Sequence, residues 1–241
     1  MFAVASLLGS LGAPEWKRLL SLVSPAFFRV VPLRELMGAV SRGVSQSRDT
    51  VAIANALGAL PRPVPGATSG DAALFLYFRQ ILRRPDCLLD LTREAFTPAA
   101  GGLDWDWKPG NLRYVFEPTF RSAIAGVYKG FYSGDDAAFS AGLAQLGLAG
   151  CEDLFRAHFG GSDQSAVTFR VSRFIETFHA IFLECKARGL ALQGDFVALG
   201  VALALLYEHL EKAGEGRPWD VRAAFLAALG DAPASPGLDA T

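Results

Sequence analysis

The chain has 241 residues, of which 51% are hydrophobic and 20% charged, and its formal net charge is −1. This length is enough to bury a sizeable core without disulfide or metal staples. The near-neutral balance, with no basic stripe, argues against nucleic-acid binding, because that binding needs clustered cations to displace the counterions of the phosphates.

The cysteines and the apolar runs indicate a cellular location. Cys87, Cys151 and Cys185 are sparse and show no paired spacing, which is typical of a reducing compartment. The apolar stretch that opens the chain has no basic residue before it, so we interpret it as a first helix rather than a signal peptide. The longest apolar run, 196–207, is much shorter than the roughly 20 residues of a membrane span, so it predicts a buried helix. We expect a cytoplasmic protein without a transmembrane segment; a peripheral membrane contact stays open.

Apolar residues recur at three-and-four spacing through most of the chain, which predicts helices. We expect a helical N-terminal part at 1–60, with helices at 15–23, 33–44 and 50–60. The stretch 61–71 contains three prolines and two glycines and predicts a linker. Thr68 or Ser69 is suited to cap the helix that follows.

The main domain is expected at 72–230 and a disordered tail at 231–241. Its predicted helices span 71–84, 86–96, 120–132, 136–148, 151–159, 165–190, 195–213 and 218–229. The stretch 112–116, "LRYVF", is aromatic and β-branched and is the one convincing strand. The predicted fold class is therefore all-α, a mainly α-helical globular domain with at most one short strand.

Polar chemistry is concentrated in "GLDWDWKPGNLRYVFEP", residues 102–118, where Asp106 and Asn111 flank a Pro-Gly turn. A carboxylate such as that of Asp106 can accept a proton from a hydroxyl. An amide oxygen can ligate Mg²⁺, and the Lys108 ammonium can steady a transferring phosphoryl group. These are the residue types that phosphoryl transfer needs.

The loop also carries a resemblance to a known family. "DWKPGNL" resembles the D-x-K-P-x-N-L catalytic loop of protein kinases and the D-x-H-P-G-N loop of the UbiB/AarF atypical kinase-like family, with Lys108 in place of the histidine. "GGLDWDWKPGN" keeps the glycine and spacing of that family's G-F-F-H-A-D-P-H-P-G-N segment. Segments 120–148 and 187–212 are similar to helices of its C-terminal lobe, so the resemblance covers roughly residues 90–230.

The resemblance implies roles for four residues and a cofactor. It implies Asp106 as catalytic base, Lys108 as phosphate contact, and Asn111 and Glu117 as metal ligands, with Mg²⁺-ATP bound if the loop is functional. A D-F-G motif, a glycine-rich phosphate loop and an N-lobe lysine have no counterpart in the sequence. We therefore expect a degenerate, non-catalytic kinase-like protein with a binding or regulatory role, linked through the family to lipid or quinone metabolism. An active member would be a phosphotransferase or ATPase.

Two other functions stay open. In the first, the chain is a plain helical protein-interaction domain, "DWKPGN" is a turn, and Trp105 and Trp107 anchor it on the core. In the second, Glu176 and His179 share one helix face and begin an oxygenase-like metal bundle, although such bundles need two of these motifs and two more glutamates.

The distribution of aromatic residues indicates a candidate ligand pocket. Phe and Tyr recur along 114–139 and 169–182 more often than packing requires. As a hypothesis, these helices flank a pocket for an isoprenoid or other lipid-like ligand, although core filling explains any single Phe.

Overall fold

A computed structural model describes residues 68–84, 86–99, 105–109, 112–159, 166–190 and 194–230, together with the backbone of 44–46. The helices predicted at 15–23 and 50–60, most of the linker and the tail lie outside the described residues.

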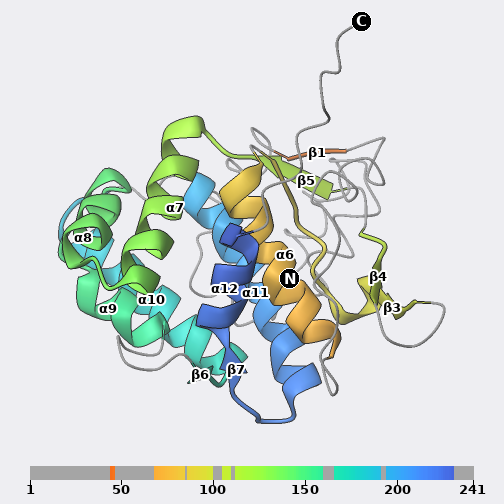
Figure 1. Cartoon of the computed structure of the whole chain (residues 1–241). Coiled ribbons are helices and arrows are strands. Elements are labelled where there is room, and N and C mark those ends of the chain that lie inside the picture. The colour runs from red at the N-terminus through yellow and green to blue at the C-terminus, as the bar shows by residue number, and fades with distance from the viewer. Residues whose placement is uncertain are drawn as a thin grey trace, which may run out of the picture.

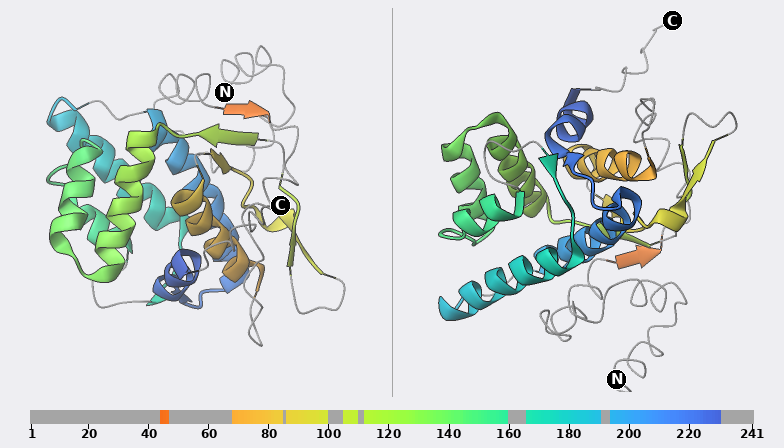
Figure 2. Two further views of the ribbon diagram at one scale, coloured as in Figure 1. Left: turned by 45° about the horizontal axis from the view of Figure 1, so that its top comes forward. Right: turned by 90° about the horizontal axis from the view of Figure 1, so that it is seen from below.

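The described residues are mainly α-helical, which confirms the predicted fold class. The helices are α6 (Ser69–Arg83), α7 (Pro118–Ser133), α8 (Asp136–Gln145), α9 (Glu152–Phe159), α10 (Val171–Ala187), α11 (Gly194–Gly214) and α12 (Val221–Gly230), with a short 3₁₀ turn η1 (Arg93–Ala95). In Figure 1, α7, α8 and α9 lie at one end of the molecule and β3 and β4 at the other, and the first view of Figure 2 agrees.

The strands are short and all of their pairings are antiparallel. They are β1 (Val44–Gln46), β2 (Asp86–Leu88), β3 (Phe96–Pro98), β4 (Trp105–Trp107), β5 (Leu112–Val115), β6 (Ala166–Val167) and β7 (Trp219–Asp220). They form one three-stranded sheet of order β1-β5-β2 and two two-stranded sheets, the β3-β4 hairpin and the β6-β7 pair, whose strands are far apart in the sequence. The strand predicted at 112–116 is confirmed as β5, but the expectation of at most one strand is wrong. Strands of two to four residues are too short to show a period in the sequence.

The predicted helix at 86–96 is also wrong, and Gln80 supplies the physical reason. The Leu88 backbone N–H donates to Gln80 Oε1 at 2.6 Å, and Gln80 Nε2 donates to the Leu88 carbonyl at 3.3 Å. The backbone N–H and carbonyl of Leu88 are thus both hydrogen-bonded to a side chain of α6. The neighbouring residue Cys87 pairs with Tyr114 of β5. A tertiary contact has overridden the local helical pattern.

The observed helix ends differ by a few residues from those predicted from the sequence. Helix α6 begins at Ser69, inside the stretch 61–71 assigned to the linker, and its N-cap is Thr68, one of the two residues expected there. The Thr68 N–H donates to Asp71 Oδ2 at 2.7 Å, as in a capping box. Val44, expected at the end of a helix, lies in β1. The predicted helix at 165–190 begins only at Val171.

Helix α11 lies at the centre of the core. It is buried along almost its whole length, and Figure 2 shows it beside α10 and α6. A helix that is apolar all round belongs in the interior of a protein or in a membrane. Within the part of the chain described here, no helix has the length and apolarity to cross a membrane. The prediction of a buried helix for 196–207 is therefore confirmed.

Candidate functional site

The structure places three of the four residues of the kinase-like loop. Asp106 is exposed in the middle of β4, opposite Thr97 of β3. The Lys108 side chain is exposed, and its backbone N–H donates to the Ala95 carbonyl at 2.8 Å. Glu117 is exposed at the N-cap of α7. Asn111 lies outside the described residues.

The two tryptophans of the loop are anchored, as the turn interpretation expects. Trp105 and Trp107 are half-buried against the core. The Trp107 indole N–H donates to the Asp90 carbonyl at 3.1 Å, and its ring stacks on Phe96 with 6.3 Å between centroids. The β3-β4 hairpin is therefore held to the core by aromatic packing.

The residues proposed for a metal bundle do not converge. Glu176 and His179 are both exposed on α10, and the nearby Glu184 carboxylate pairs with the Arg188 guanidinium at 2.6 Å. Among the described residues, no three His, Cys, Asp or Glu side chains are grouped so as to hold a metal ion.

Sequence reasoning missed Asp195, a buried carboxylate in the first turn of α11. Its Oδ1 accepts a hydrogen bond from the Tyr114 hydroxyl at 2.6 Å, and its Oδ2 accepts one from the Glu117 backbone N–H at 2.8 Å. One aspartate thus fixes β5 and the start of α7 against α11. Its partners are far away in sequence, so no local pattern could have indicated this role.

His209 was also missed. Its Nδ1 lies 2.9 Å from the Leu91 carbonyl, which can only accept, so Nδ1 carries the proton and Nε2 accepts from the Ser69 hydroxyl at 2.8 Å. This is the hydrogen-bond order of a nucleophile and its base. Ser69 and His209 are nonetheless buried, with only 4% and 1% of their surface exposed. We therefore assign these hydrogen bonds a structural role, in which they connect α6 and α11 to the loop before η1.

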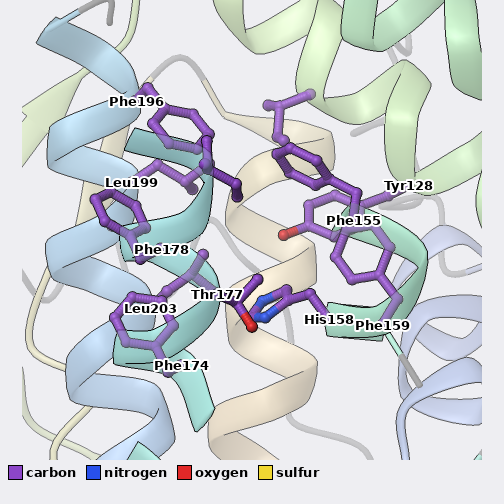
Figure 3. A pocket seen from close by; sticks show the side chains of 13 residues that line it. Tyr128, Phe155, His158, Phe159, Phe174, Thr177, Phe178, Phe196, Leu199 and Leu203 are labelled. Carbon is purple, nitrogen blue, oxygen red and sulfur yellow. The ribbon is translucent and has the colours of Figure 1, made fainter. Parts of the chain in front are cut away.

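An aromatic cavity lies between α7, α9, α10 and α11, and Figure 3 shows its walls. Helices α7 and α10 are those that the aromatic pattern of the sequence singled out; α9 and α11 were not expected to contribute. The lining residues are Ile124, Tyr128, Phe155, His158, Phe159, Phe174, Thr177, Phe178, Ile181, Phe196, Leu199, Gly200 and Leu203. Among these described lining residues, none carries a carboxylate, ammonium or guanidinium group.

The polar groups of the cavity are few and uncharged at neutral pH. Burial, together with the smaller effect of the nearby Arg173 guanidinium, lowers the pKa of His158 to about 4. The Tyr207 hydroxyl lies 3.2 Å from His158 Nε2. Burial also raises the pKa of Tyr128, whose hydroxyl is 2.5 Å from that of Tyr77. Figure 3 shows the His158 ring and the Tyr128 hydroxyl facing the space between the aromatic walls.

A second cavity continues the first on the far side of a shared wall. The residues common to both are Tyr128, His158, Phe159 and Leu203. The volumes are about 20 Å³ for the first cavity and about 30 Å³ for the second, room for a water molecule or two in each. A ligand larger than this must therefore move side chains aside to enter.

Comparisons of the chain with models of protein families, with curated proteins and with solved structures gave no match.

Proposed function

We propose that this chain is a non-catalytic helical binding protein that holds a small, uncharged, largely apolar molecule between α7, α9, α10 and α11. The observation that carries this proposal is the aromatic cavity. A concave apolar space with a few convergent polar groups of perturbed pKa is the usual form of a small-molecule site.

The chemistry of the lining defines the ligand class. An ion would lose its hydration without gaining a counter-charge there, at a cost of several kcal/mol. The ligand should therefore be neutral, with an aromatic or isoprenoid body that packs on the rings. It should carry one or two oxygen atoms that bond to the His158 ring, the Thr177 hydroxyl or the Tyr128 hydroxyl. The resemblance to the UbiB/AarF family supports the same class, since that family is associated with lipids and quinones.

A thermal-denaturation panel tests this proposal. Indole, 1-naphthol and a short isoprenoid alcohol serve as neutral probes, and a fatty acid of similar size serves as the charged comparison. A probe at about 100 times its dissociation constant should stabilise the fold by about 2.7 kcal/mol. The fatty acid should give no shift.

A matched pair of variants assigns the shift to the cavity. Leu203→Phe adds volume to the wall shared by both cavities and should abolish the shift without loss of stability, because it fills space already empty. Leu183→Phe makes the same change on the exposed face of α10 and should keep the shift. A shift unchanged in Leu203→Phe would refute the cavity as the site.

A second candidate function rests on the exposed side chains of Asp106, in the middle of β4, and of Lys108, directly after β4. In this proposal the chain is a kinase-like relative, a pseudokinase in the cytoplasm, whose loop still binds Mg²⁺-ATP. Denaturation with Mg²⁺-ATP tests it. A shift lost in Asp106→Asn and Asn111→Ala, but kept in the exposed control Asp153→Asn, would support a nucleotide site. No shift in the parent protein would leave the loop as a turn.

A further inference from the structure

Two of the three cysteines lie at neighbouring helix ends. Cys151 immediately precedes α9, and its carbonyl accepts the Phe155 N–H at 3.1 Å. Cys185 is in the last turn of α10, and its carbonyl accepts the Leu190 N–H at 2.8 Å, which closes the helix end over Gly189 in the left-handed conformation. Both thiols are buried in the same core.

Arg188 fixes these two helix ends against each other. Its Nη1 donates to the Ala149 carbonyl at 2.6 Å and its Nη2 to the Gly150 carbonyl at 3.4 Å. Residues three apart share one face of a helix, so Arg188 and Cys185 approach α9 from the same side. Because Gly150 is bonded to Cys151, the arginine next to one thiol holds the backbone next to the other.

The contact is close at Gly150. A Cβ built on Gly150 would lie 2.2 Å from Arg188 Nη1, so the guanidinium rests directly on the glycine, whose φ of +83° is also one that other residues avoid. The Arg188–Glu184 ion pair above the contact is exposed, with 41% and 38% of the two side chains accessible. Cys151 and Cys185 themselves are buried, with 1% and 2% of their surface exposed.

The electrostatics agree with this proximity. Burial raises the pKa of the Cys151 thiol, and the Arg188 guanidinium opposes that effect. Burial also raises the pKa of the Cys185 thiol, and the next largest contribution comes from Cys151. Each thiol is within electrostatic reach of the other and of the same cation.

We propose that Cys151 and Cys185 form a reversible oxidation site, at which a low-molecular-weight disulfide converts the two thiols to one intramolecular disulfide. The Cys151 thiolate attacks the small disulfide and releases one small thiolate, leaving a mixed disulfide. The Cys185 thiolate then attacks the Cys151 sulfur and releases the second small thiolate. The two protein thiols lose two protons and two electrons, and the small disulfide is reduced to two thiols.

The bond joins two helices that line the aromatic cavity, α9 through Phe155 and Phe159 and α10 through Phe174 and Phe178. It should stabilise the fold by restricting the unfolded chain. If the proposed ligand-binding function holds, the bond should also slow ligand entry, because the two helices can no longer separate at this end. The disulfide itself can be tested without any ligand.

The test treats the folded full-length protein with glutathione disulfide and identifies the cross-link by mass spectrometry of unreduced peptides. We expect a peptide pair joined through Cys151 and Cys185, a thermal midpoint raised by several degrees, and reversal of both by dithiothreitol. Cys185→Ser should lose the cross-link and the shift together. Cys87→Ser is the matched control, since Cys87 is equally buried but lies on β2, and it should retain both.

Two results would overturn the proposal. One is a folded protein in which Cys151 and Cys185 stay free thiols, or carry only separate glutathione adducts, after long oxidation. The other is a cross-link that forms only in denaturant. If Cys185→Ser fails to fold, the cross-link map of the parent protein and of Cys87→Ser still decides the question.

Discussion

At the scale of single residues, the protonation of His158 links the cavity to the stability of the fold. Burial lowers its pKa to about 4, below the value of about 6.5 expected in the unfolded chain. The neutral ring is therefore favoured in the folded state. The contribution of neutral His158 to the free energy of unfolding is complete above about pH 6.5. This contribution is lost as the pH falls from there towards 4.

We therefore expect the parent protein to lose up to about 2–3 kcal/mol of stability over that pH range through this group. Urea denaturation at a series of pH values measures the loss. His158→Gln should remove that part of the pH dependence, whereas His179→Gln, on the exposed face of α10, should leave it in place. Parallel pH profiles for the parent protein and His158→Gln would contradict the prediction.

Asp195 is the residue on which the β5–α7 junction depends. Hydrogen bonds to a charged acceptor are stronger than neutral ones, and a buried donor left without an acceptor costs about 1–3 kcal/mol. Asp195→Asn keeps the size of the side chain but offers only one acceptor oxygen to the Tyr114 hydroxyl and the Glu117 N–H. We expect a loss of about 1–3 kcal/mol in chemical denaturation.

Asp106→Asn is the control for this change, because Asp106 is exposed on β4. Its stability should stay within about 0.5 kcal/mol of the parent protein. Equal effects at the two aspartates would mean that Asp195 acts through net charge and not through its two hydrogen bonds.

At the scale of elements, the close approach of α7 and α8 rests on Gly130. A Cβ added there would lie 2.4 Å from the backbone nitrogen of Phe139, and backbone cannot move aside as a flexible side chain can. Gly126, on the same helix, has no atom within 4 Å of such a Cβ. The two glycines therefore separate the packing cost of a methyl group from its effect on helix propensity.

We expect Gly130→Ala to destabilise the protein by about 1–3 kcal/mol through overpacking. Gly126→Ala should stabilise it by about 0.5–1 kcal/mol, the ordinary gain of alanine over glycine in a helix. Thermal and urea denaturation of both variants provide the measurement. A gain in stability for Gly130→Ala would show that α7 and α8 are not packed as closely as the structure has them.

Helix α12 depends on α6 in a different way. Arg79 Nη1 donates to the Ala228 carbonyl at 3.1 Å and Arg83 Nη2 to the Leu229 carbonyl at 2.5 Å. The last carbonyls of a helix have no partner within the helix and carry its partial negative charge. Two arginines of α6 therefore fix the C-terminal end of α12, which explains how a ten-residue helix keeps a defined place.

At the scale of the whole molecule, α11 should be the last element to open. It contacts α6 and α10, its Asp195 carboxylate binds the β5–α7 junction, and His209 connects it to the α6 N-terminus. Amides in such a segment open only with global unfolding, whereas peripheral helices open locally.

Hydrogen exchange followed by mass spectrometry measures this difference. We expect the slowest exchange in peptides from the middle of α11 and faster exchange in α8, which lies at one end of the molecule (Figure 1). Exchange in α11 as fast as in α8 would contradict the central role given to α11.

Local sequence patterns were enough to predict the helices and two walls of the cavity. Periodic apolar residues and their caps predicted α6 to α12, because helix formation depends on neighbours three and four residues away. The aromatic pattern along 114–139 and 169–182 indicated α7 and α10, which do line the cavity. Its ligand stays a proposal, as do the roles of Asp106, Lys108, Asn111 and Glu117.

The short strands, the buried polar network and the position of Cys151 and Cys185 at adjoining helix ends became visible in the fold alone. Residues 86–88 form a strand because Gln80 and β5 bind them, and neither partner is adjacent in the sequence. Asp195, His158 and His209 acquire their roles from groups that folding brings to them across long stretches of chain. Periodicity reflects contacts between residues three and four apart in one helix, whereas hydrogen bonds between distant segments leave no regular spacing in the sequence.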